Sequence, residues 1–133
     1  MIAMLLAVLA AQAAVNGDSG TINLSGRCQY ADAAARFRQE ASLALCDSLS
    51  IDRAEETATF DFSQRSWGSM LRFTGEMSGQ HMAVNSVRLR SGSSVEATGT
   101  CEIFYSGKKV SVVSCLAKAG PKTYAANFVR SRL

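Results

Sequence analysis

The chain is poor in the residues and motifs on which most enzymes depend. Among its 133 residues there is one histidine, His81, one tryptophan and one proline. The sequence contains no Gly-x-Ser-x-Gly elbow, no glycine-rich phosphate loop and no His-Glu-x-x-His zinc helix. His81 follows a Ser-Gly-Gln turn, and nothing in the sequence places a Ser or Cys nucleophile beside it. We therefore expect no catalytic residue, no cofactor and no metal, and predict that the protein is not an enzyme.

The cysteines lack the spacing of a redox or zinc site. No Cys-x-x-Cys occurs, which argues against a thioredoxin-type centre and a zinc ribbon. The four cysteines, an even number in a small chain, favour two disulfides formed in an oxidising compartment. Three pairings are open, and we favour the sequential one, Cys28 with Cys46 and Cys101 with Cys115. In the alternative, one or both of the thiols of Cys101 and Cys115 stay free and buried as small apolar side chains.

Acidic residues are missing from the C-terminal part of the chain. All eleven Asp and Glu residues lie at or before Glu102, whereas six of the fourteen Lys and Arg residues follow it. The net charge of +3 therefore hides an acidic N-terminal part and a basic C-terminal part. The basic part is a candidate contact for an anionic surface, although a solvated face that protects strand edges would show the same composition.

The first fourteen residues, MIAMLLAVLAAQAA, carry no side-chain charge and are too few to cross a bilayer as a helix. Ala11-Gln12-Ala13 has the small-x-small pattern of a signal-peptide cleavage site, so residues 1–14 are predicted to be a secretory signal segment. The Lys or Arg that usually precedes the apolar stretch is absent. A buried N-terminal helix is the alternative. We expect a periplasmic or secreted protein with no membrane span after signal removal.

Residues 15–20 are predicted to be a flexible linker, and residues 21–133 a single β domain stapled by the disulfides. Apolar and polar residues alternate with a period of two in about eight short segments, separated by turn signals about ten residues apart. This spacing is typical of a single antiparallel sheet closed or packed as a small barrel or sandwich. Its segments are residues 21–30, 43–51, 57–62, 70–77, 81–90, 95–105, 110–117 and 123–130.

Two features interrupt the strand pattern. Residues 31–41 are rich in alanine, arginine and glutamate, which predicts one short amphipathic helix. In residues 81–90 the apolar parity switches near Asn85, which predicts a β-bulge. We also expect the last strand to pair with the first, because closure would remove the exposed edges of the sheet.

Residues 95–118 are predicted to be a long β-hairpin with a turn at Ser106-Gly107. With a four-residue loop, Cys101 lies opposite Ser114 and the two sulfurs point to different faces. One extra loop residue or one bulge places Cys101 opposite Cys115, since a one-residue slip swaps the faces of every side chain. Both registers keep apolar groups together, and we favour the register that allows the bridge.

Candidate contact residues lie in one loop, one strand and one turn. Trp67 is the only tryptophan and lies in a loop, where it either anchors a partner or folds back to plug the end of the core. An arginine row at Arg88 and Arg90, near Arg72, could bind a carboxylate or phosphate, or be a solvated face. The residues selected as partner contacts are Arg65, Trp67, Arg88, Arg90, Lys108 and Lys109.

The composition therefore favours a small exported binding or inhibitor module that contacts a protein or an anionic envelope component. We expect a monomer that does not bind nucleic acid. A structural or accessory envelope protein without a ligand is the first alternative, and an enzyme is the second. An exported barrel with two disulfides is similar in architecture to several periplasmic inhibitor and ligand-binding folds. That similarity concerns architecture alone and does not determine a function.

Overall fold

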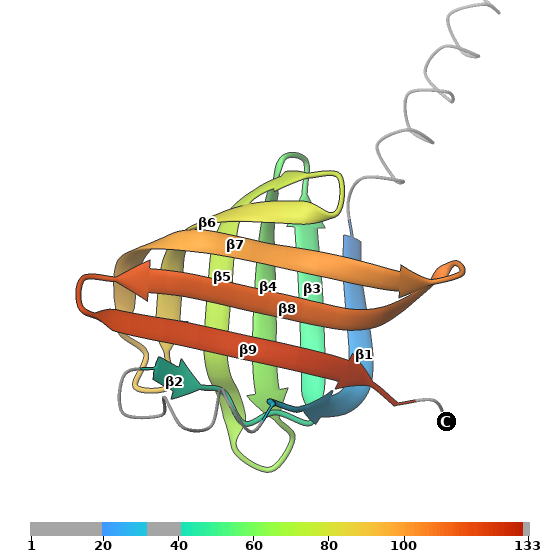
Figure 1. Ribbon diagram of the computed structural model, residues 1–133, viewed down its shortest axis with the longest axis horizontal. Helices are drawn as coiled ribbons and strands as arrows, with labels where there is room; N and C mark the ends of the chain where they lie inside the picture. The colour runs from blue at the N-terminus through green and yellow to red at the C-terminus, as the bar shows by residue number, and fades with distance from the viewer. Residues whose placement is uncertain (1–19, 32–40, 132–133) are drawn as a thin grey trace, which may run out of the picture.

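Nine β-strands follow one another in the computed structural model, which describes residues 20–31 and 41–131 (Figure 1). Short turns join most of them, as the glycine-containing turn sequences predicted. The strands are β1 (Gly20–Cys28), β2 (Ala41–Leu43), β3 (Ser48–Ala54), β4 (Thr57–Gln64), β5 (Gly68–Ser78), β6 (His81–Leu89), β7 (Ser94–Ser106), β8 (Lys109–Ala119) and β9 (Lys122–Arg130).

Eight of these strands form a closed antiparallel barrel. From β3 to β9 each strand pairs with the next along the chain, and β1 pairs with both β3 and β9. Residues 20–25 of β1 pair with β3, and residues 26–28 then pair with the end of β9. The three-residue strand β2 runs parallel to the start of β9 and occupies the rest of that edge. The predicted barrel and the predicted closure between the last and first strands are both confirmed.

Three glycines, Gly26, Gly75 and Gly99, lie where neighbouring strands approach closely. At Gly26, where β1 changes partner, a β-carbon would lie 2.2 Å from the carbonyl oxygen of Val129. At Gly75, beside a register shift between β5 and β6, the corresponding distance to the Ala83 oxygen is 1.9 Å. Any side chain at these positions would collide with backbone, so glycine is required to form the bends. The predicted bulge near Asn85 is confirmed by a register shift between Val84 and Ser86.

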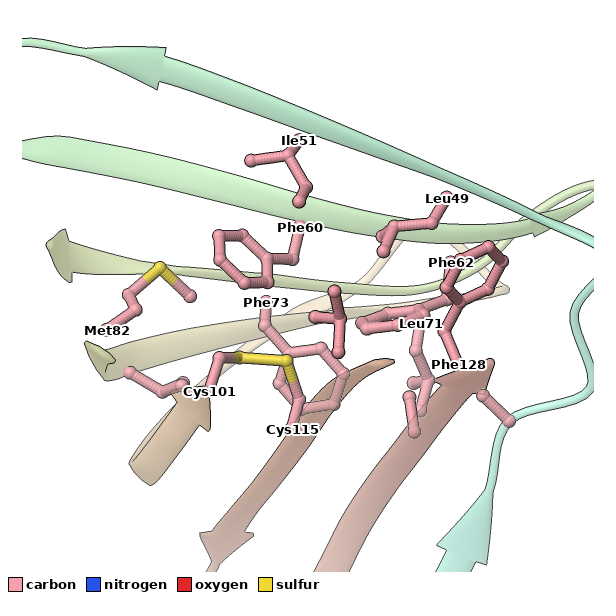
Figure 2. Packing of buried hydrophobic residues seen from close by; sticks show 14 of the residues in the cluster. Leu49, Ile51, Phe60, Phe62, Leu71, Phe73, Met82, Cys101, Cys115 and Phe128 are labelled. Carbon is pink, nitrogen blue, oxygen red and sulfur yellow. A yellow bond between two sulfur atoms is a disulfide. The ribbon is translucent and has the colours of Figure 1, made fainter. Parts of the chain in front are cut away.

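The barrel interior is filled with apolar side chains (Figure 2). The rings of Phe62 and Phe73 meet edge to face, with centroids 5.7 Å apart. Within the described residues every buried side chain is apolar. This packing follows from the period-two pattern, which turns one face of every strand inward. The largest fully buried side chains are Phe60, Phe62, Phe73, Phe128, Leu49, Ile51, Met82, Val87, Val113 and Cys101.

Both predicted disulfides are present. Cys28 and Cys46, with Cα atoms 5.0 Å apart, join the end of β1 to the segment that precedes β3. Cys101 and Cys115 lie directly opposite each other in β7 and β8, with Cα atoms 4.0 Å apart. A register shift at Phe104 places the two sulfurs on the same face. The register of the four-residue loop is present at Tyr105 and Val110 but is wrong for Cys101, which faces Cys115 and not Ser114, and the alternative with one bulge is confirmed.

The single strand predicted over residues 43–51 is wrong. The chain forms two strands there, β2 and β3, which pair with different neighbours and are separated by residues 44–47. Ala44 is buried and Leu45 is 62% exposed, so the burial pattern also changes parity within the segment. The chain changes its pairing partner here because β2 lies beside β9, a strand about 80 residues later in the sequence. A local pattern of apolar and polar residues contains no information about so distant a neighbour.

Some predictions concern residues that the structure does not describe. The helix predicted over residues 31–41 falls almost entirely on 32–40, which lie outside the described residues, and its last residue, Ala41, begins β2 instead. The signal segment, residues 1–14, and residues 15–19 of the linker also lie outside them. Gly20, assigned to the linker, is the first residue of β1.

Candidate binding surface

The six candidate contact residues lie at two different ends of the barrel. Arg65 and Trp67 belong to the turn between β4 and β5, and Arg90 directly follows β6. Lys108 lies in the β7–β8 turn, and Lys109 is the first residue of β8. Consecutive turns of an antiparallel meander lie at alternate ends, so the β4–β5 and β6–β7 turns share one end and the β7–β8 turn lies at the other (Figure 1). The structure therefore divides the predicted contact residues into two surfaces.

Trp67 lies on the protein surface, with 66% of its area exposed. Its backbone N–H donates a hydrogen bond to the carbonyl oxygen of Gln64, at 2.9 Å, which closes the turn. Gly68 has a φ of +97°, a conformation that residues with a side chain rarely adopt. The tight turn thus points the indole outward, and Trp67 does not plug the core.

Arg90 covers one face of the indole. Its guanidinium carbon lies 4.4 Å from the centroid of the Trp67 ring, which is the geometry of a cation–π contact. At an exposed site such a contact contributes about 0.5–1 kcal/mol. The two residues come from different hairpins, so the contact links the two turns at this end of the barrel and favours one orientation of the indole.

A pocket of about 360 Å³ adjoins this pair, and Arg90 is part of its wall. Its wall contains two cations, Arg90 and Lys122, and no acidic residue. Leu45 projects at its edge with 62% of its area exposed. The pocket and Trp67 together form what we call the tryptophan end, an apolar and cationic surface. Further apolar residues of the wall are Leu43, Met70, Leu71, Leu89 and Tyr124.

Arg65 stabilises the turn that carries Trp67. Its backbone N–H donates to Asp47 Oδ1 at 3.0 Å, and its Nη2 donates to Ser25 Oγ. These bonds connect the β4–β5 turn to β1 and to the segment before β3. Arg65 therefore holds the turn that carries Trp67, and its guanidinium is already engaged within the protein.

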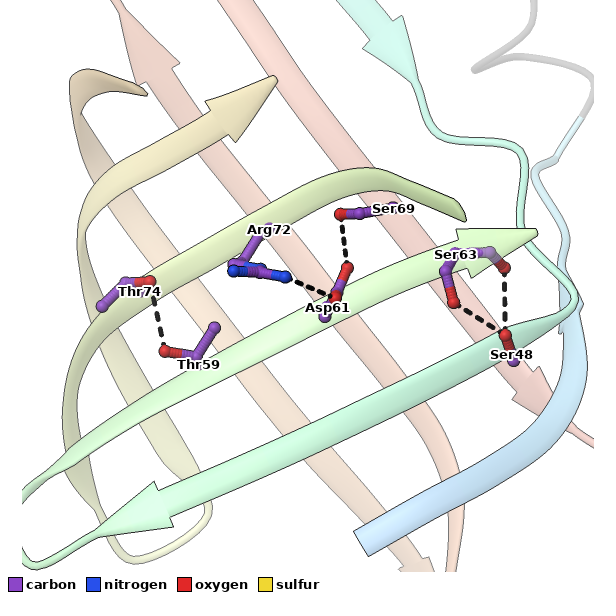
Figure 3. Close-up of polar contacts among 7 residues, drawn as sticks. All are labelled: Ser48, Thr59, Asp61, Ser63, Ser69, Arg72 and Thr74. Carbon is purple, nitrogen blue, oxygen red and sulfur yellow. Dashed lines mark hydrogen bonds and ion pairs between the residues drawn. The ribbon is translucent and has the colours of Figure 1, made fainter. Parts of the chain in front are cut away.

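The three arginines of the predicted row have different surroundings in the structure. Arg72 and Arg88 are opposite each other in β5 and β6, as expected. However, Arg72 Nη2 forms an ion pair with Asp61 Oδ2 at 3.0 Å, so its charge is compensated (Figure 3). Arg88 is exposed, and Arg90 contacts Trp67. The three arginines therefore do not converge on one anion site.

The outer face of β3, β4 and β5 carries a ladder of polar side-chain pairs (Figure 3). The hydroxyls of Ser48 and Ser63 lie 2.7 Å apart, and Ser69 donates to Asp61 Oδ1 at 2.6 Å. Such cross-strand pairs satisfy one another on a solvated sheet face. This face thus differs in chemistry from the apolar and cationic tryptophan end.

His81 begins β6 and is exposed, as expected for a turn histidine. Its Nδ1 lies 3.7 Å from Glu102 Oε1 on β7. Within the described residues no group of three or more His, Cys, Asp or Glu side chains has the arrangement of a metal site. In the same part of the chain, no helix has the length and apolar character needed to span a membrane.

Two exposed aromatic residues beside the lysines were not predicted from the sequence. Phe104 and Tyr105 are 43% and 44% exposed at the end of β7. The period-two pattern placed Tyr105 on the inner face, but Tyr105 lies beyond Glu102, the last residue of β7 that pairs with β6, so no neighbouring strand covers it on that side. The length of β6 relative to β7, which determines this exposure, is not contained in the pattern of β7.

Tyr30 is a partly buried residue beside the barrel closure. Its hydroxyl donates a hydrogen bond to the carbonyl oxygen of Ala44 at 2.6 Å. Burial, which disfavours the phenolate, raises the pKa of Tyr30 to about 12. The bond connects the chain after β1 to the chain after β2, near the Cys28–Cys46 bridge.

Comparison with known proteins identifies no relative for this barrel. A scan against protein-family models found no match, and neither the curated proteins nor the solved structures gave one.

Proposed function

We propose that this protein is an exported binding module, periplasmic or secreted, that contacts a partner protein through the tryptophan end. The observation that carries the proposal is Trp67, which is 66% exposed while Arg90 lies over its ring. Hot spots of protein interfaces are enriched in Trp and Arg, because Trp buries a large area at a low cost in conformational entropy and Arg adds a planar cation that stacks on rings. The contact between Arg90 and Trp67 partly orders both side chains before the partner arrives.

The surroundings of the pair indicate the chemistry of the partner. Leu45 and the adjoining pocket offer apolar area, while Arg90 and Lys122 supply positive charge without a neighbouring acid in the pocket wall. A segment with an apolar side chain followed by a carboxylate would complement both parts. The pocket is large enough for one or two side chains, so the partner contributes a short projecting segment.

Export is supported by the two disulfides, which form and persist in oxidising compartments. The uncharged apolar stretch at residues 1–14 supports the same location. A binding role outside the cytoplasm also fits the covalent bridges, since a small domain in that environment gains stability from them.

The proposal is tested by replacing Trp67 with alanine in the oxidised, mature protein. We expect W67A to unfold at the wild-type temperature, because the indole is outside the core, and to lose at least about tenfold in affinity for the partner. Photo-crosslinking from position 66, which is exposed beside Trp67, identifies the partner in an envelope extract, and titration against the purified partner then measures the affinity. R90A is expected to weaken binding in the same direction.

Leu116 provides the matched control, because it is 56% exposed on β8 and lies outside the tryptophan end. L116A is expected to bind as the wild type does. Equal loss in W67A and L116A would contradict the proposal. A large decrease in the stability of W67A would show a structural role for Trp67 instead, and undiminished binding by W67A would leave an accessory role in the envelope as the better account.

A further inference from the structure

The tip of the β7–β8 hairpin extends beyond the strands on both sides of it. The pairing of β6 with β7 ends at Glu102, and the pairing of β8 with β9 begins at Val112. Residues 104–111 therefore pair only within the hairpin, and Figure 1 shows this turn projecting from the barrel. We call residues 104–111 the hairpin tip. It lies at the end of the barrel away from Trp67.

Two aromatic side chains are exposed on the hairpin tip, and no other part of the described structure covers them. Phe104 and Tyr105 are 43% and 44% exposed, whereas Val110 in the returning strand is 8% exposed and belongs to the core. The tip is thus anchored at its base by Val110, and its aromatic residues face outward. Exposed aromatics on a projecting turn are available to a partner that can receive a convex surface.

Positive charge accompanies the aromatic residues. Lys108 lies in the turn and Lys109 directly follows it, and both are exposed. Arg130 reaches the base of the tip, where its Nη1 donates to the carbonyl oxygen of Val110 at 3.5 Å. The sequence contains no acidic residue after Glu102, and the carboxylate of Glu102 faces His81. The tip itself, residues 104–111, therefore carries a charge of +2, while Glu55 and Glu56 of the β3–β4 turn lie at the same end of the barrel.

We propose that the hairpin tip is a peripheral membrane contact that binds anionic lipid surfaces. Tyrosine rings partition into the interface between headgroups and acyl chains, phenylalanine rings add apolar contact there, and lysines are attracted to anionic headgroups. A soft bilayer accommodates a convex tip, whereas a rigid protein partner would need a matching cavity. This site is separate from the tryptophan end and does not depend on the function proposed for it.

The first experiment measures co-sedimentation of the oxidised protein with vesicles. Binding is expected to vesicles that contain phosphatidylglycerol, to decrease with added salt, and to be weak for pure phosphatidylcholine. The K108Q/K109Q variant is expected to bind anionic vesicles about thirty-fold more weakly, which corresponds to about 1 kcal/mol for each lysine. The F104S/Y105S variant is expected to bind more weakly through the loss of apolar contact.

A matched charge control is available at the other end of the barrel. R88Q/K118Q removes the same charge from exposed positions near the ends of β6 and β8, outside both proposed sites. It is expected to bind anionic vesicles as the wild type does. Equal loss in both double variants would overturn the proposal, because it would show that the overall charge, and not the tip, determines binding.

A second measurement reports whether the tip enters the interface. In W67F/F104W the only indole lies on the tip, and its emission is expected to shift to shorter wavelength with anionic vesicles. The wild type, whose indole lies at the opposite end, is expected to show no shift. An unchanged spectrum for W67F/F104W, or binding to soluble polyphosphate as tight as binding to vesicles, would overturn the proposal. Every variant used in these experiments is first shown to have the melting temperature of the wild type and two intact disulfides.

Discussion

At the scale of single residues, Tyr30 links ionisation to barrel stability. Its hydroxyl bonds to Ala44 beside the Cys28–Cys46 bridge, and burial holds its pKa at about 12, above the ordinary value of 10. The folded state therefore binds this proton more tightly than the unfolded state does. Its contribution to stability is complete below pH 10 and is lost as the pH rises from about 10 through 12.

We predict that Tyr30→Phe makes the decrease of stability between pH 10 and 12 less steep than in the wild type. Thermal unfolding measured across this range gives the comparison, and a difference titration of phenolate absorbance gives a midpoint near 12 for Tyr30. Tyr105→Phe is the control, because Tyr105 is 44% exposed. The interpretation fails if wild type and Y30F show the same pH profile.

The residue scale also shows why the binding surface was only partly predictable. As the only tryptophan, in a predicted loop, Trp67 was a candidate contact residue. Its contact with Arg90, however, joins two hairpins and depends on how far each strand extends. Likewise, Arg72 and Arg88 were expected side by side, yet the ion pair of Arg72 with Asp61 changes what the row can bind. Sequence patterns locate side chains along a strand and contain little about their partners.

At the scale of elements, the two disulfides stabilise different parts of the fold. Their sequence separations are 18 for Cys28–Cys46 and 14 for Cys101–Cys115. In the chain-entropy model each closure contributes about 3 kcal/mol. The second bridge has a further role, because Cys101 is completely buried and both sulfurs fill part of the core (Figure 2).

We predict that C101A/C115A lowers the free energy of unfolding more than C28A/C46A does, by about 1–2 kcal/mol beyond a loss of about 3 kcal/mol that is common to both. The additional loss comes from the cavity that the missing sulfurs leave. Chemical denaturation of both double variants measures the difference. An equal loss would mean that the core closes over the space, and a larger loss in C28A/C46A would contradict the prediction.

The strands themselves were predicted well where one face is buried along the whole element. Phe60 and Phe62 in β4 illustrate this, since their alternation with polar residues matches their burial. The prediction failed over residues 43–51 because Leu45 continued the parity of Leu49 while the chain was changing partner from β9 to β4. Local periodicity reports which face is apolar and cannot report which strand lies alongside.

At the scale of the whole molecule, closure through β1 and β9 gives the barrel its cooperativity. β9 is paired along one side with β8 and along the other with β1 and β2. It is therefore an interior strand although it is the last one in sequence. The hairpin tip, by contrast, has no flanking strand on either side.

We predict that native-state hydrogen exchange separates these two regions. Amides of residues 123–129 are expected to exchange only through global unfolding, whereas amides of residues 104–111 exchange through local opening. Exchange detected by mass spectrometry or NMR in the oxidised protein gives the comparison. Rapid exchange of β9 in the folded protein would contradict the closed barrel, and protection of the tip equal to that of β9 would contradict its independence.

The charge asymmetry of the sequence has a different meaning in three dimensions. The basic C-terminal part was expected to act together with Trp67, but the turns alternate between ends and separate Lys108 and Lys109 from Arg90. The number and sign of the charges follow from composition, whereas their distribution over the surface follows from the alternation of the turns. That distribution is why two distinct contacts are proposed in place of one.

The direct pairing of Cys101 with Cys115 also bears on how the protein matures. A slipped hairpin would keep its apolar residues together but would hold the two thiols on opposite faces, out of bonding reach. Oxidation therefore selects the correct alignment, since only chains with the bulge at Ser111 of β8 acquire the bridge. Chains synthesised without an oxidant would have to select between the two alignments by packing alone.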